Sequence, residues 1–164
     1  MSLSKLTAAL GHSFADRALL QTALTHRSFG ASNNERLEFI GDGVLNCVIA
    51  VALFRRYPDL DEGDLSRMRA NLVRQDTLHR LAVALHLGDS LRLGEGELKS
   101  GGNQRPSILA DTVEALIGAV YLDGGFEAAQ ALIGRLYLPM FDELTSGAVT
   151  KDAKTTLQEW LQAR

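Results

Sequence analysis

The sequence has little of what marks a secreted or membrane-bound protein. Its 164 residues include one cysteine, Cys47, so no intrachain disulfide can form, as expected in a reducing compartment. The first residues, MSLSKLTAALGHSF, lack a cationic region followed by an apolar stretch, which argues against a signal peptide. The most apolar stretches, residues 44–54 and 108–122, are too short or too interrupted by acids to predict a membrane span. We therefore expect a cytoplasmic protein with no membrane partner and with Cys47 in its core.

A large excess of charge of either sign is also absent. The chain has 17 Lys and Arg residues against 20 Asp and Glu residues, for a net charge of −3. This balance excludes a polycation that coats nucleic acid through its net charge. It does not exclude nucleic acid as a partner, because a local patch or bound metal ions can reverse the local sign. With 46% apolar residues, the chain is able to fill the core of one ordinary domain.

Strict apolar–polar alternation, the pattern of a half-buried strand, never lasts long enough to predict one. Helical periodicity is found nearly everywhere, so we expect an all-α fold. Gly124 and Gly125 predict a break between two helices, and Pro139 predicts a kink or break in the second. The glycine-rich stretch 94–106 is predicted to be a loop, and the small, polar stretch 145–150 a linker. The predicted helices cover residues 4–10, 16–24, 34–54, 61–87 (one or two helices), 107–122, 126–144 and 151–164.

Two predicted helices are apolar nearly all round and yet carry carboxylates. Glu35, Glu38 and Asp42 occur at i, i+3 and i+7, which places them within about 60° of one another on a helix. In the second helix, Asp111 and Glu114 are one turn apart. Neither helix has a lysine beside these acids. The acids are therefore expected on a largely apolar face, although acids at the partly exposed edge of a core helix remain an alternative.

Several carboxylates buried together repel one another and lose their hydration, unless divalent cations lie between them. Sites made only of oxygen ligands select hard ions such as Mg²⁺ or Mn²⁺. Such an ion lowers the pKa of a bound water and orients it for attack. Di-iron sites are disfavoured, because they use Glu-x-x-His pairs and the i+3 partners here are Glu38 and Glu114. The pattern predicts a metal-dependent site for phosphodiester hydrolysis where the two helices cross.

The segment NERLEFIGDGVL (residues 34–45) closely resembles the signature of ribonuclease III, an endonuclease that cuts double-stranded RNA. The segments LTHRSF, DEGDLSRMRANLV, GEGELKSGG and SILADTVEALIGAVYLDGG resemble the bacterial family in order and spacing. The segment KDAKTTLQEWLQAR resembles the first helix of a double-stranded RNA-binding domain. The resemblance implies a helical catalytic domain over residues 1–144, a linker over 145–150 and the start of a truncated RNA-binding domain over 151–164.

The resemblance also implies roles for individual residues. Glu38, Asp42, Asp111 and Glu114 match the metal-binding carboxylates of the family, with Asp42 and Glu114 as the catalytic pair. Among them, Glu114 is expected to be indispensable. The implied cofactor is Mg²⁺, for which Mn²⁺ is able to substitute.

Further residues match accessory positions of the family. Glu35 and Glu62 match two accessory acids at the ends of the cleft, and Phe39 matches an aromatic that plugs into the partner subunit of a homodimer. A homodimer would carry two acidic sites along one cleft. Six residues are candidates for RNA contact, with a solvated surface role as the alternative for each: Arg27, Ser28, Lys99, Arg105, Gln158 and Gln162. His26 is expected to be a structural residue at a helix end.

The implied activity is metal-dependent cleavage of double-stranded RNA, in the processing of rRNA and mRNA. The expected products carry 5′-phosphate and 3′-hydroxyl ends with short 3′ overhangs. A non-cleaving RNA-binding relative and a helical metal phosphohydrolase of small molecules are the two other candidates. Gly43 follows Asp42 where alanine or serine is frequent in the family, and it is expected to cost about 1 kcal/mol against alanine unless close packing requires it.

Overall fold

The computed structural model describes residues 3–150, with side chains described through residue 142. Over these residues the chain is helical and forms no sheet, and its one β-type contact is an isolated parallel bridge between Thr25 and Arg92. The all-α prediction is therefore confirmed. The elements are α1 (Leu3–Leu10), α2 (Arg17–Ala23), α3 (Glu35–Arg56), α4 (Glu62–Val73), α5 (Gln75–Ala84), η1 (Leu87–Asp89), α6 (Glu95–Lys99), η2 (Gly102–Gln104) and α7 (Pro106–Thr150).

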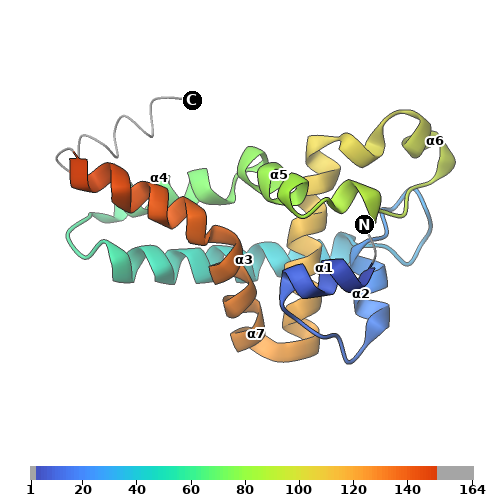
Figure 1. Cartoon of the computed structure of the whole chain (residues 1–164), viewed down its shortest axis with the longest axis horizontal. Coiled ribbons are helices and arrows are strands. Elements are labelled where there is room, and N and C mark those ends of the chain that lie inside the picture. Colours follow the sequence, from blue (N-terminus) through green and yellow to red (C-terminus); the bar gives the residue numbers. More distant parts are fainter. Residues whose placement is uncertain (1–2, 151–164) are drawn as a thin grey trace.

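The core forms around the crossing of α3 and α7, the two long helices, which pack on each other more extensively than any other pair (Figure 1). Leu45 and Ile49 of α3 and Leu116 and Ile117 of α7 are fully buried there. Helices α2 and α5 also pack on α7, and α4 packs on α3. Removal of these apolar side chains from water is the main source of stability in such a core.

Helix α7 changes direction at Gly125, which confirms the predicted break. Gly125 has φ 79° and ψ −176°, a backbone conformation that residues with a side chain rarely adopt. Beyond Gly125 the helix turns back along the molecule (Figure 1), and the Tyr137 hydroxyl donates to the Leu72 carbonyl oxygen of α4 at 3.0 Å. At Pro139, where a kink or break was predicted, the helix continues, so a break there is wrong: the non-helical dihedrals inside α7 are those of Gly125.

The connection between α1 and α2 is attached to α7 just before this change of direction. The Asp123 carboxylate accepts hydrogen bonds from the backbone N–H groups of Ala15, at 3.0 Å, and Asp16, at 2.8 Å. The His12 ring, through Nε2, lies 2.7 Å from the same carboxylate. The bond from the Asp16 backbone, together with those from His12 and Ala15, holds the pKa of Asp123 below its ordinary value. The N-terminal segment is therefore part of the folded unit.

Two predicted irregular stretches contain helical structure. The expected loop 94–106 holds the five-residue α6 and the 3₁₀ turn η2. Helix α6 has Glu95 and Glu97 in its first turn, where negative charge stabilises a helix, and Glu97 pairs with Arg105 at 2.7 Å. The expected linker 145–150 is the helical end of α7. The predicted division into domains stays a prediction, because residues 151–164, with Gln158 and Gln162, lie outside the described residues.

Cys47 is exposed, so its predicted place in the core is wrong. It lies on α3 with two other exposed side chains, Phe39 and Phe54, which are 82% and 71% exposed. Helical spacing places these residues on one face, since they are separated by eight and seven positions. An apolar face of α3 is therefore left open in the single chain.

The two longest helices, α3 and α7, extend well beyond the apolar stretches that the sequence showed as too short for a membrane span. Within the described residues, α3 and the part of α7 through Asp142 are long and apolar enough to cross a bilayer by length and composition alone. Both are core helices that pack on each other, a setting in which soluble proteins pass the same test. The apolar runs read from the sequence were shorter than the helices that contain them.

Candidate metal centre

Two glycines allow α3 and α7 to cross with their backbones in contact. A Cβ atom on Gly41 would lie 1.8 Å from the carbonyl oxygen of Glu114, and one on Gly118 would lie 2.1 Å from that of Leu37. Carbon and oxygen atoms cannot approach so closely, so this crossing requires glycine at both positions. This role of Gly41 and Gly118 was not predicted from the sequence, although glycine inside an apolar helix is itself a signal of close approach.

The crossing brings three carboxylates together. Glu38 of α3 and Asp111 and Glu114 of α7 each offer an oxygen atom, and these atoms lie within 4.8 Å of one another. All three side chains are partly buried. We call these three residues the carboxylate cluster. The predicted convergence of acids from the two helices is therefore observed for three of the four matched positions.

Asp42, the fourth predicted ligand, lies beside the carboxylate cluster and not within it. Its side chain is exposed, and its Oδ1 accepts a hydrogen bond from Asn46 Nδ2 at 2.7 Å. Asn46 Nδ2 also donates to the Asp42 carbonyl oxygen at 3.0 Å. The negative charge of Asp42 still acts on Glu114, whose pKa it helps to raise. A contact of Asn46 with a predicted ligand was not foreseen from the sequence.

Burial and mutual repulsion disfavour negative charge on the carboxylate cluster. Burial, and then the charges of Asp42, Glu38 and Asp111, raise the pKa of Glu114 to about 8. Burial is also the main cause that raises the pKa of Glu38 and that of Asp111. No described residue donates a hydrogen bond to these three carboxylates. The charges of Arg27 and His26 offset these raised pKa values only in part. A site of oxygen ligands whose mutual repulsion is not fully offset fits a hard divalent cation.

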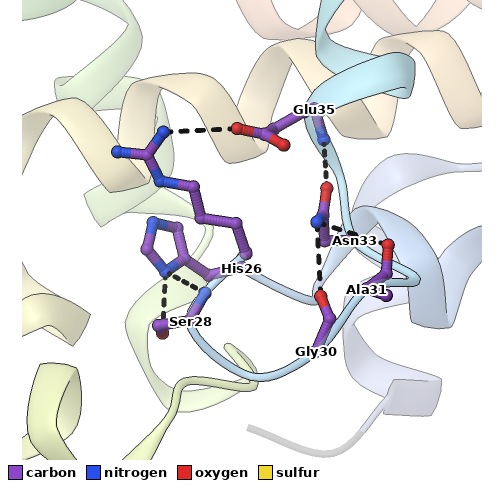
Figure 2. A network of polar contacts seen from close by, with 7 residues as sticks. His26, Ser28, Gly30, Ala31, Asn33 and Glu35 are labelled. Atoms are coloured by element: carbon purple, nitrogen blue, oxygen red, sulfur yellow. Dashed lines mark hydrogen bonds and ion pairs between the residues drawn. The ribbon is translucent and has the colours of Figure 1, made fainter.

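Glu35, an accessory acid in the sequence prediction, begins α3 one turn before Glu38. Its Oε1 lies 3.3 Å from Nη1 of Arg27, and both side chains are more than half exposed (Figure 2). Its charge also raises the pKa of Glu38, so it lies near the carboxylate cluster. Glu35 is therefore at the edge of the site and already has a cationic partner.

Glu62, the other accessory acid, lies elsewhere in the single chain. It begins α4 and accepts a hydrogen bond from the Ser66 hydroxyl at 2.6 Å. It shares a surface pocket with Phe54 and Arg55, near the C-terminal end of α3. Phe54 is 54 − 38 = 16 residues beyond Glu38 on α3, a rise of about 24 Å along a helix. The structure therefore does not bring Glu62 to the carboxylate cluster of its own chain.

A polar pocket of about 480 Å³ adjoins the carboxylate cluster and includes Glu38 and Asp111 in its wall. Three of the predicted RNA contacts, Arg27, Ser28 and Arg105, also line this pocket. Lys99 is not among its lining residues and pairs with Glu95 across 3.7 Å on an exposed surface. The pocket thus places cations and hydroxyl groups beside the acidic site.

Residues 26–28 form one wall of this pocket and are held by the neighbouring backbone. The His26 N–H donates to the Arg92 carbonyl oxygen at 3.0 Å, and the Gly94 N–H donates to the Ser28 hydroxyl at 3.0 Å. The His26 ring, through Nδ1, accepts from the Ser28 N–H and contacts its hydroxyl (Figure 2). These bonds agree with the expected structural role of His26, which also partly offsets the raised pKa of Asp111.

The chain matches proteins of one family over most of its length. A family model described as Ribonuclease-III-like matches residues 16–141. The protein named Ribonuclease 3 from Dechloromonas aromatica is 66% identical over 164 residues, which are all of this chain and 74% of that relative. Ribonuclease 3 from Bordetella pertussis is 63% identical over the whole chain and 64% of its own length.

Solved structures of related nucleases have the same fold as this chain. The nuclease domain of ribonuclease III from Campylobacter jejuni superposes with a TM-score of 0.82 at 45% identity, over 85% of this chain and 96% of that one. Dicer from Pichia stipitis superposes with a TM-score of 0.64 at 26% identity, over 82% of this chain and 60% of that one. The helical fold and these matches define an endoribonuclease. The chain belongs to the ribonuclease III family.

Proposed function

We propose that this endoribonuclease hydrolyses double-stranded RNA with a divalent cation held at the carboxylate cluster. The products carry 5′-phosphate and 3′-hydroxyl ends with short 3′ overhangs. The observation that supports the proposal is the convergence of Glu38, Asp111 and Glu114 from two helices, with oxygen atoms within 4.8 Å of one another. Arg27 offsets the raised pKa of Glu38 only in part, and His26 and Arg27 do the same for Asp111. No described residue donates a hydrogen bond to the three carboxylates, which supports a bound cation.

The ligand chemistry favours Mg²⁺, with Mn²⁺ as a substitute, because all the donors are carboxylate oxygens. Glu38, Asp111 and Glu114 would hold the ion, with Asp42 at the exposed edge of the site. When bound, such an ion supplies an activated water for attack on the phosphodiester and stabilises the departing 3′-oxygen. With a pKa of about 8, Glu114 holds a proton at neutral pH until a cation displaces it.

Residues beside the carboxylate cluster would bind and orient the RNA. Arg27 and Arg105 line the adjoining pocket. Arg27 is paired with Glu35 and Arg105 with Glu97, and each arginine would bind an RNA phosphate in place of its carboxylate partner. Ser28 contributes a hydroxyl group to the same wall. Such contacts position the backbone without reading base sequence. Selection of the duplex would rest on A-form shape and 2′-hydroxyl groups.

The open face of α3 supports a homodimer. Phe39 is 82% exposed, and a large exposed aromatic on an apolar face is typical of an interface. A pocket of about 530 Å³, lined in part by Leu37, Ile40 and Leu122, opens near the start of the same helix. In a two-fold dimer, each Phe39 would enter the pocket of the other copy. A related Campylobacter jejuni structure is described by flexibility in a region involved in dimer formation.

A dimer would also give Glu62 a role. Glu35 and Glu62 lie toward opposite ends of α3, so two copies packed across this helix would present both acids along one shared cleft. The proposed dimer carries one carboxylate cluster per copy, and the two would cut the two strands. We also propose that the enzyme acts in the cytoplasm, in the processing of rRNA and mRNA.

Cleavage of a labelled RNA duplex tests the proposal. Wild-type protein with Mg²⁺ is expected to cut the duplex and to leave 5′-phosphates. Glu114→Gln is expected to slow cleavage at least about a thousandfold, or about 4 kcal/mol of transition-state stabilisation. Glu127→Gln, which changes an exposed acid on the same helix beyond Gly125, is the matched control and should retain activity.

Three other outcomes would contradict the proposal. Cleavage at the wild-type rate by Glu114→Gln would remove the assigned role of that residue. Duplex binding without cleavage at any metal concentration would favour a non-cleaving relative. Faster hydrolysis of nucleotides than of duplex RNA would favour a phosphohydrolase of small molecules.

A further inference from the structure

Two adjacent asparagines precede α3, and the first of them supports the start of this helix. Asn33 Oδ1 accepts a hydrogen bond from the Glu35 N–H at 3.1 Å (Figure 2). Its Nδ2 donates to the carbonyl oxygens of Gly30, at 3.2 Å, and Ala31, at 3.4 Å. Asn33 therefore satisfies one of the backbone donors that a helix start leaves free.

Asn34 stands at the N-cap position itself but makes no side-chain capping bond. It is 2% exposed, and its Nδ2 is buried without a hydrogen-bond partner. Its backbone is satisfied, because its N–H donates to the Thr25 oxygen and its oxygen accepts from the Glu38 N–H, both at 2.9 Å. A buried donor without an acceptor costs about 1–3 kcal/mol. Neither helix capping nor a bond to the backbone accounts for the burial of the Asn34 side-chain amide.

The unpartnered amide lines the same pocket as two members of the carboxylate cluster. Asn34, Glu38 and Asp111 all contribute to its wall, from the start of α3 and from α7. The amide is a donor without an acceptor, and these carboxylates are acceptors without a donor. Burial raises the pKa of both acids, and the charges of Arg27 and His26 offset this only in part.

We propose that Asn34 is a positioning residue of the metal centre: once a cation is bound, its side-chain NH₂ would donate to the free carboxylate oxygens of Glu38 and Asp111, the pocket-lining acids beside it. This inference rests on the metal centre proposed above. A carboxylate that gives one oxygen to a cation keeps a second oxygen that requires a donor, and such outer contacts fix the orientation of metal ligands. An amide NH₂ carries two hydrogens, one for each acid.

Binding of Mn²⁺ alone, without RNA, tests the inference. Asn34→Leu removes both donors and keeps a similar volume. The dissociation constant for Mn²⁺, measured by titration calorimetry, is expected to rise about ten- to a hundredfold. Without metal, the Tm of this variant should be no lower than that of the wild type, because an unsatisfied donor has been removed. The rise in Tm produced by Mn²⁺ should shrink.

Two controls separate positioning from a general structural role. Ser90→Ala removes a buried hydroxyl that, like the Asn34 amide, lacks a partner but does not line the pocket beside the carboxylate cluster, and it should leave Mn²⁺ affinity unchanged. Asn33→Ala removes the bonds that support the start of α3, so it should lower the Tm in the absence of metal and leave Mn²⁺ affinity near that of the wild type.

A lowered metal-free Tm with wild-type affinity in Asn34→Leu would overturn the inference, because the side chain would then act on the fold alone. Should that variant fail to fold, Asn34→Ala decides, and an unchanged dissociation constant in it would likewise overturn the inference. Failure of the wild type to bind Mn²⁺ would remove the metal centre and this inference together. Wild-type binding that Glu114→Gln abolishes and Asn34→Leu preserves would remove the role of Asn34 alone.

Discussion

The two faces of α3 differ in what they contact. On the inner face, Gly41 touches the backbone of α7, and a Cβ there would lie 1.8 Å from a carbonyl oxygen. On the outer face, a Cβ on Gly43 would meet nothing within 4 Å, and Phe39 lies open beside it. The same residue type, two positions apart, is required at one site and free at the other. The inner face builds the carboxylate cluster within one chain, whereas the outer face is left for a second copy.

The largest effect is expected when the inner face is disturbed. Gly41→Ala forces α3 and α7 apart, so it should lower the free energy of unfolding by about 3 kcal/mol. It should also weaken Mn²⁺ binding, because Glu38 moves away from Asp111 and Glu114. Denaturant unfolding and metal titration measure the two effects. Unfolding at the wild-type midpoint with unchanged Mn²⁺ affinity would show that the crossing tolerates a methyl group.

On the outer face, Phe39→Ala should separate the proposed dimer and leave each chain folded. Truncation of a central aromatic in an interface costs about 2 kcal/mol or more, which is at least about a thirtyfold rise in the dimer dissociation constant. Sedimentation equilibrium measures this constant, and circular dichroism checks that helix content is retained. A dimer as tight as that of the wild type would place the interface elsewhere.

Where the inner face of α3 meets α7, the stability of the protein is expected to depend on pH through Glu114. The folded-state pKa of Glu114 is about 8, against an ordinary value of 4.5, so between these pH values the folded protein binds this proton more tightly than the unfolded chain. Stability of the metal-free protein should therefore fall as the pH rises through this interval. Glu114→Gln should flatten the decline measured by denaturant unfolding across pH 5 to 8. An equally steep decline in that variant would assign the effect to other groups.

The smallest effect is expected at Gly43. In the Phe39→Ala background, where no partner covers the outer face, Gly43→Ala should raise the free energy of unfolding by up to about 1 kcal/mol, because alanine is the better helix former. Within the single chain, no close packing requires glycine at this position. Comparison of the two unfolding midpoints measures the gain. A loss of stability would mean that the outer face is occupied within one chain.

Local patterns predicted much of the fold. The all-α class, the helix that begins near residue 34 and the break at Gly125 follow from periodicity and glycine positions, and the structure confirms them. Helix α6, within residues 94–106, was not predicted, because its five residues are too few to show helical periodicity between the glycines Gly94, Gly101 and Gly102. Cys47 was placed in the core because nothing near it in the sequence indicates a reactive thiol, whereas the structure leaves it exposed on α3.

The candidate site could be predicted in part. Periodicity placed Glu38 on one helix and Asp111 and Glu114 on another, but it could not show how the helices cross. The position of Asp42 outside the carboxylate cluster depends on that crossing and on Asn46. The roles of Gly41 and Asn34 likewise depend on what another element places against them, which spacing along one helix does not contain.

The attachment of the N-terminal segment to Asp123 bears on how a catalytic fragment should be cut. The family match begins at residue 16, yet Leu6 and Leu10 have no exposed surface, and the His12 ring contacts Asp123. A fragment trimmed to the matched boundary would strip two leucines from the interior and leave the Asp123 carboxylate without its imidazole partner. Expression designs for this nuclease should therefore keep the first fifteen residues, even though the family model begins only at residue 16.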